Sequence, residues 1–141
     1  MYMNLTPSKL KLCLTLSLAF ASLSVVAQVI NVSLSGAQEV PAVSTTASGY
    51  GTITIGADQS VSGSVTTTGV EGTMAHIHMA ATGQNGPVIV PKTKTADNVW
   101  SIPAGAKLTD PQYQSFKDGN LYINVHSATN KGGEVRGQLK P

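Results

Sequence analysis

The chain has 141 residues, with nine lysines and arginines, seven acidic residues and a single cysteine, Cys13. This length suits one hydrophobic core of ordinary size and not two, so we expect one domain. Two of the basic residues, Lys9 and Lys11, precede an apolar stretch near the start, and without them seven basic residues face seven acidic ones. With equal numbers of basic and acidic residues, the rest of the chain has no basic excess of the kind expected in a protein that binds nucleic acid or an anionic membrane.

The first 27 residues predict a signal peptide. The two lysines are followed by the uncharged, mostly apolar run 12–21, which is about half the ~20 residues that a membrane-spanning helix needs. Val25 and Ala27 place small side chains at the positions that signal peptidase reads. We therefore expect cleavage after Ala27, with cleavage after Ala21 as the alternative.

Export changes the chemistry available to residues 28–141, the domain that remains. The only cysteine lies in the removed segment, so this domain has neither a thiol nor a disulfide. The residues before Cys13 lack the small side chain expected ahead of a lipidated cysteine. We expect a secreted or periplasmic domain without a membrane anchor, whose stability depends on its apolar core.

Eight β-strands are expected after residue 28, because short runs rich in Val, Ile, Thr and Ser alternate with clusters of Gly, Pro, Asn and Asp. Apolar and polar side chains alternate within the runs: Ile53 and Ile55 share one face of their strand, and Thr52 and Thr54 share the other. One-sided burial of this kind predicts an antiparallel β-sandwich, either Greek-key and immunoglobulin-like or superoxide-dismutase-like. The expected strands are residues 29–35, 48–56, 60–68, 73–80, 86–90, 98–102, 120–127 and 133–140.

One short helix is expected before the seventh of these strands. Thr109 or Asp110 can cap its start, a proline follows in the first turn, and Gly119 supplies a left-handed exit. Tyr113 and Phe116 lie three residues apart on one face. A helix this short needs tertiary packing to be stable, so we expect the two aromatic side chains to dock on the sheet and close one end of it.

Three histidines form the candidate site: His76, His78 and His126 all lie on expected strands and face away from the apolar side. His76 and His78 are two residues apart and share a strand face, a spacing that brings two imidazoles to one ion in many copper and zinc sites. His126 joins them if its strand lies close to theirs, an adjacency that is assumed and not read from the sequence. The hypothesis is a mononuclear site for copper, or less favourably zinc, with water or the new N-terminal amine as a further ligand.

Four polar residues are expected around the histidines: Tyr122, Asn124, Glu134 and Arg136. The first two share the strand face of His126, and a hairpin through residues 127–133 would put the other two on that face. The Glu134 carboxylate could then orient one imidazole. The alternative is that the histidines are solvated or hydrogen-bonded residues of a polar sheet face that help to hold Glu134 and the neighbouring loops.

An ordered set of short motifs runs through residues 28–141. They are LSGAQEVP at 34–41, ASGYG at 47–51, GSVTT at 63–67, AHIH at 75–78, GQNGPV at 83–88, NLYINVHS at 120–127 and GGEVRGQL at 132–139. Together they resemble the chordin-type domain, the CHRD family. This family takes its name from repeats in an animal extracellular protein that antagonises growth factors, and it also occurs as small secreted microbial proteins. A single domain behind a signal peptide is similar to the second kind.

Two functions are consistent with these patterns. The first is a secreted, non-enzymatic binding or structural module for an extracellular protein or a small ligand, because no phosphate-binding loop, serine elbow or recognisable carboxylate pair is present. The second is a copper- or zinc-binding protein, redox-active if the ion is copper. The His-x-His strand is similar to that of copper-zinc superoxide dismutases, but three histidines are too few for their two-metal centre, so a dismutase is not predicted.

Overall fold

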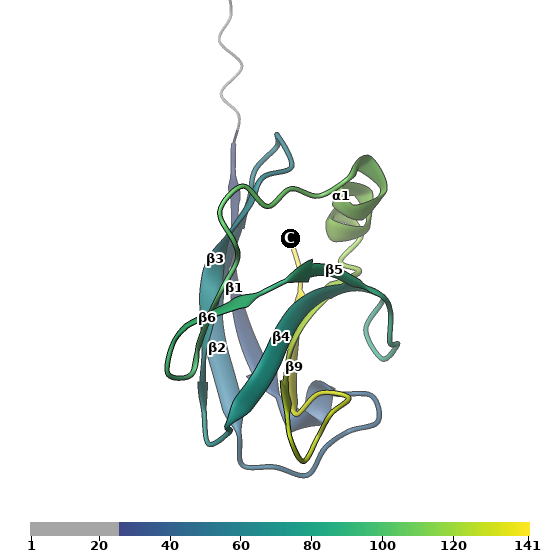
Figure 1. Cartoon of the computed structure of the whole chain (residues 1–141). Helices are drawn as coiled ribbons and strands as arrows, with labels where there is room; N and C mark the ends of the chain where they lie inside the picture. Colours follow the sequence, from purple (N-terminus) through teal and green to yellow (C-terminus); the bar gives the residue numbers. More distant parts are fainter. Residues whose placement is uncertain (1–25) are drawn as a thin grey trace, which may run out of the picture.

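The computed structural model describes residues 26–141 (Figure 1). The predicted signal peptide, apart from its last two residues, and Cys13 therefore lie outside the described residues. The elements are β1 (Gln28–Ser35), the short 3-10 helix η1 (Gly36–Gln38), β2 (Ser48–Ile55), β3 (Val61–Thr68), β4 (Gly72–Met79), β5 (Val88–Pro91), β6 (Thr93–Ala96), β7 (Val99–Ser101), α1 (Asp110–Lys117), β8 (Leu121–Ser127) and β9 (Val135–Leu139). Within residues 26–141, no helix is both long and apolar enough to cross a membrane.

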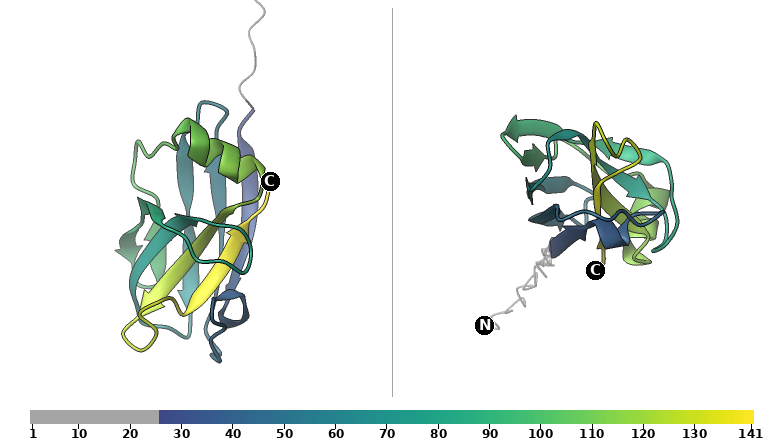
Figure 2. Two further views of the ribbon diagram at one scale, coloured as in Figure 1. Left: turned by 90° about the vertical axis from the view of Figure 1, so that its right-hand side faces the viewer. Right: turned by 90° about the horizontal axis from the view of Figure 1, so that it is seen from below.

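The nine strands form one antiparallel sheet in the order β5-β4-β8-β9-β1-β2-β3-β7-β6. Its two edge strands, β5 and β6, are consecutive in sequence and separated only by Lys92, whose backbone N–H donates to the Ala75 carbonyl of β4 at 2.9 Å. The sheet therefore curves round until its edges meet, and it is a nearly closed barrel (Figures 1 and 2).

The predicted all-β, antiparallel class with one short helix is confirmed, whereas the predicted sandwich is not what the described residues form. The alternation of apolar and polar side chains shows that each strand buries one face. It does not distinguish two sheets packed face to face from one sheet curved onto itself, because both arrangements bury the same face of every strand.

Apolar side chains from almost every strand fill the inside of the barrel. Ile53 of β2, Ile77 of β4 and Ile123 of β8 have no exposed surface, and Trp100 of β7 is buried among them. The alternation predicted for these strands is therefore confirmed. The faces of β4 and β8 that point away from the core carry polar side chains, and the three histidines lie on these faces.

Helix α1 lies across one end of the barrel, as Figure 2 shows. Its start is a capping box: the Thr109 hydroxyl accepts from the Gln112 backbone N–H at 3.4 Å, and the Gln112 side chain accepts from the Thr109 N–H at 2.9 Å. Phe116 is buried, Tyr113 packs against the core, and Gly119 follows with φ of +73°. The predicted cap, docking face and left-handed exit are all confirmed.

Candidate metal centre

Strands β4 and β8 are neighbours, and their register brings the histidines together. Met74 lies opposite His126, His76 opposite Asn124 and His78 opposite Tyr122. Because Ala75 and Ile77 point into the core, the histidines occupy the outer face of the barrel. The adjacency that the sequence hypothesis assumed is therefore present.

The three imidazoles converge. Nδ1 of His76 lies 3.0 Å from Nε2 of His126, and one nitrogen from each ring lies within 4.8 Å of the others. Two nitrogens bound to the same zinc or copper ion, with bonds of about 2 Å each, are at most about 4 Å apart. Small rotations of the rings would therefore bring all three nitrogens into coordination distance, and this cluster could hold a metal ion.

Backbone carbonyls fix the protonation of two of the rings. Nδ1 of His78 donates to the Gly86 carbonyl at 2.9 Å, and Nδ1 of His126 donates to the Lys131 carbonyl at 2.9 Å. A carbonyl only accepts, so in the neutral form of either ring Nδ1 carries the proton and Nε2 carries the lone pair. Metal-bound histidines are commonly oriented in this way.

His78 leaves a buried nitrogen without a partner. Its Nε2 has almost no exposed surface and no hydrogen bond to any residue from 26 to 141. Burial is also the main reason why the pKa values of His76 and His78 lie below the ordinary value for histidine. Both rings are therefore neutral at physiological pH, which is the form that binds metal ions.

Of the expected neighbours, Tyr122 and Arg136 stack beside His78, whereas Glu134 bonds to a different residue. Tyr122 stacks on His78, with ring centroids 4.7 Å apart and planes 5° apart, and the Arg136 guanidinium carbon lies 3.4 Å from the centroid of the Tyr122 ring. Glu134 instead accepts a hydrogen bond from the Thr45 hydroxyl at 2.8 Å. The Glu134 carboxylate was expected to accept a hydrogen bond from one imidazole and so to orient it. Backbone carbonyls accept from His78 and His126 instead.

Arg136 links this stack to the loop between β4 and β5. It is 1% exposed, and its guanidinium donates to the Ala81 carbonyl at 3.3 Å and to the Asn85 side chain at 3.4 Å. The same loop presents Gly86, whose N–H donates to the Tyr122 hydroxyl at 3.3 Å and whose carbonyl holds His78. The predicted neighbours Arg136 and Tyr122 therefore position the loop that orients a candidate ligand.

Asn124, the remaining expected neighbour, lies on the same sheet face between His76 and Arg136 in the register. Its side-chain amide donates to the Gly132 carbonyl at 3.3 Å, in the loop that also supplies the Lys131 carbonyl to His126. Sequence reasoning missed the Gly86 and Lys131 carbonyls. The only sequence signal near them is turn chemistry, the glycines of the 83–88 and 132–139 motifs.

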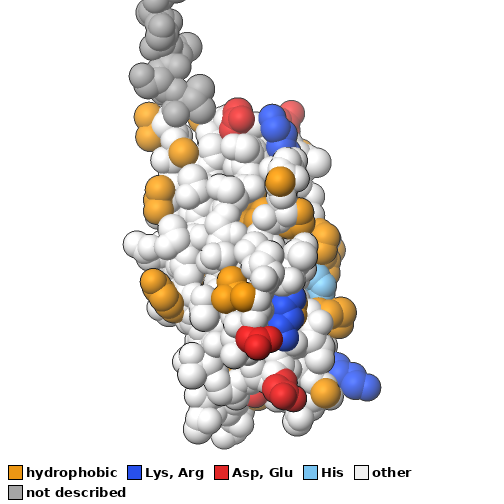
Figure 3. Space-filling model, turned by 60° about the vertical axis from the view of Figure 1, so that its left-hand side comes forward, with side chains coloured by type: hydrophobic (Ala, Val, Ile, Leu, Met, Phe, Trp, Pro, Cys, Tyr) orange, Lys and Arg blue, Asp and Glu red, His pale blue; other side chains and the backbone are white. Residues whose placement is uncertain are grey.

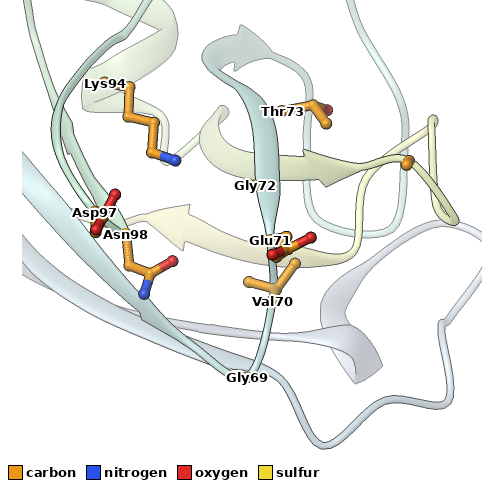
Figure 4. Close-up of a pocket in the computed structure, with 9 residues that line it drawn as sticks. Gly69, Val70, Glu71, Gly72, Thr73, Lys94, Asp97 and Asn98 are labelled. Carbon is orange, nitrogen blue, oxygen red and sulfur yellow. The ribbon is translucent and has the colours of Figure 1, made fainter.

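A pocket of about 700 Å³ lies beside the lower part of β4, and none of its lining residues is a histidine. Figure 4 shows segment 69–73 on one side and Lys94, Asp97 and Asn98 on the other. These residues carry charges of both signs, and none of the three histidines lines the pocket.

A family model described as the CHRD domain matches residues 30–139, which extend from β1 to β9 and include all three histidines. No curated protein and no solved structure matches the chain.

Proposed function

The chain belongs to the CHRD domain family, and from that premise we propose that it is an exported, non-enzymatic module that binds one transition-metal ion through His76, His78 and His126. The family defines the domain and not its ligand, so the proposal depends on the site. The observation that carries it is the convergence of three imidazole nitrogens within 4.8 Å.

Hydrogen bonding alone leaves this cluster incomplete. A proton on Nδ1 of His76 can satisfy Nε2 of His126, but Nε2 of His78 stays buried without a donor from the described part of the chain. An unsatisfied buried polar atom costs about 1–3 kcal/mol. A bound cation would use this lone pair, together with that of His126 and one from His76.

The ligand set favours copper or zinc. Imidazole suits both ions, and copper(II) binds a given nitrogen site more tightly than zinc(II) in the Irving–Williams order. The site has no thiolate, because the only cysteine of the chain is Cys13 in the predicted signal peptide. Copper is therefore the first proposal and zinc the alternative.

Metal titration of the purified protein tests the proposal. We would use a Cys13→Ser background, because a retained thiol would compete for the metal, and measure Cu(II) and Zn(II) binding by calorimetry. One equivalent should bind, and His78→Ala and His126→Ala should each weaken binding by at least the roughly 10–100-fold that loss of an outer hydrogen-bond partner already causes. Glu71→Gln is the control, since Glu71 is exposed and is not one of the three clustered histidines.

Folding and binding can be separated in the same experiment. A metal that binds only the native state stabilises it by about 2.7 kcal/mol at 100 times the dissociation constant, so it should raise the melting temperature of the parent and not of the histidine variants. Far-UV circular dichroism would show whether the variants are folded. Unchanged affinity and an unchanged thermal shift in folded His78→Ala and His126→Ala would exclude the site.

Export is proposed from the first 27 residues. It is tested by mass spectrometry of the protein recovered from the extracellular or periplasmic fraction, which should begin at Gln28, or at Ser22 if the alternative cleavage occurs. A recovered chain that begins before Lys11 would contradict the signal peptide.

A further inference from the structure

Met74 lies next to the histidine cluster on the same face of the sheet. It alternates with His76 and His78 along β4, so the three side chains point to the same side. Across the sheet it is the direct register partner of His126 on β8. Side chains that are directly opposite in an antiparallel pair have Cβ atoms about 4.5–5.5 Å apart, which is within reach of a flexible thioether.

A bulge produces this placement. The register shifts between Gly72 and Met74, so that Gly72 pairs with Ser127 while Met74 pairs with His126. Without the extra residue, Thr73 would lie opposite His126. Bulges are enriched next to functional sites, where they redirect a side chain. Here the bulge puts a sulfur atom on the histidine face.

The side chain of Met74 is also free to coordinate. It is 50% exposed, whereas His78 and His126 are 8% and 7% exposed. Figure 3 shows a histidine at the surface with hydrophobic side chains on both sides of it. Met74 is therefore an exposed neighbour of His126, and a fourth ligand there can complete a coordination shell that three imidazoles leave open.

We propose that the Met74 thioether is this fourth ligand and that the site selects Cu(I). Soft thioether ligands favour Cu(I), whereas zinc(II) is served well by imidazole and water. The inference rests on the proposed function, because it requires the three-histidine site. It adds a ligand and an oxidation state that the histidines alone do not specify.

Two matched leucine variants test the inference. Met74→Leu removes the sulfur from an exposed position, and Met79→Leu removes one from the opposite face of the same strand, where Met79 packs against the core. In the Cys13→Ser background, Cu(I) affinity would be measured anaerobically by competition with bicinchoninate, and Zn(II) affinity by competition with a chromophoric chelator. His126→Ala is included as the test of the site itself.

Met74→Leu should weaken Cu(I) binding by roughly 10–100-fold or more and leave Zn(II) binding unchanged, because a lost ligand should cost no less than a lost outer-shell partner. Met79→Leu should change neither affinity. X-ray absorption at the copper edge should show a sulfur neighbour in the parent and in Met79→Leu, and none in Met74→Leu.

The outcomes separate the two proposals. If His126→Ala loses Cu(I) while Met74→Leu binds it as tightly as the parent, Met74 is a surface side chain only: the inference is overturned and the histidine site stands. Equal losses of Cu(I) and Zn(II) affinity in Met74→Leu, or equal losses of Cu(I) affinity in the two leucine variants, also overturn the inference. Full Cu(I) and Zn(II) binding by folded His126→Ala overturns the proposed function and the inference with it.

Discussion

Glu39 is a buried carboxylate that should make the stability of this protein fall as the pH rises. It is 6% exposed, and its Oε1 has no hydrogen-bond partner among residues 26–141. Burial raises the pKa of Glu39 from 4.5 to about 7, although the positive charge of Arg136 acts in the opposite direction. The native protein therefore keeps this side chain protonated in mildly acidic solution.

The direction of the effect follows from proton binding. Between pH 4.5 and about 7, the native chain holds a proton on Glu39 that the unfolded chain has released, so the free energy of unfolding falls as the pH rises through this interval. At 1.36 kcal/mol per pH unit, the interval gives an upper bound of about 3 kcal/mol. The loss is complete above the folded-state pKa and absent below the unfolded-state value.

Glu39→Gln isolates this effect, because glutamine has nearly the same shape and does not ionise. We expect the free energy of unfolding of the parent, relative to Glu39→Gln, to fall by about 2–3 kcal/mol between pH 4.5 and pH 8. Urea denaturation in the presence of a chelator would measure it. His76 and His78 titrate in both proteins, so their contributions cancel in the difference.

Glu71→Gln is the matched control, since Glu71 is exposed. Its free energy of unfolding relative to the parent should vary little with pH. A difference between the parent and Glu39→Gln that stays flat from pH 4.5 to pH 8 would refute the reasoning, because it would mean that Glu39 ionises alike in the folded and unfolded chains.

Two further substitutions test buried features, each by urea denaturation. Burial lowers the pKa of Lys92 from 10.5 to about 8. Lys92→Met should therefore raise the free energy of unfolding at pH 7 by up to about 3 kcal/mol. A loss of stability in this variant would show that the Lys92 amine has a favourable partner. Gly133 has φ of +132°, and a Cβ there would overlap the side chains of Glu39 and Asn124. Gly133→Ala should therefore cost about 2–4 kcal/mol, while Gly132→Ala, which meets nothing within 4 Å, should be nearly neutral; equal effects would contradict this account.

The strands and the helix were predictable because their signals are local. Ile53 and Ile55 alternate with threonines, and Thr109 and Gly119 mark the ends of α1 whatever the helix packs against. Strand β6, by contrast, was not predicted: all of its residues, 93–96, are exposed, so no apolar alternation marks it. It is recognisable only by its pairing with β7.

The three histidines of the candidate site were predictable, and the groups that support them were not. The parity of strand positions placed His76 and His78 on one face, and the pairing of β4 with β8 brought His126 to them. The groups that orient two of the rings are the carbonyls of Gly86 and Lys131, and any residue type supplies a carbonyl. Met74, the proposed fourth ligand, obeys the same parity as His76, but methionine is a common apolar residue and gave no signal of its own in the sequence.

The edge strands β5 and β6 also affect the tendency of the folded domain to aggregate. A sheet with free edges can recruit strands from other molecules and start aggregation. Here each edge strand has only four residues, β5 ends in Pro91, and β6 carries Lys94, features that discourage further pairing. The two short edge strands thus limit intermolecular strand addition, in a domain that has no disulfide to hold its edges together.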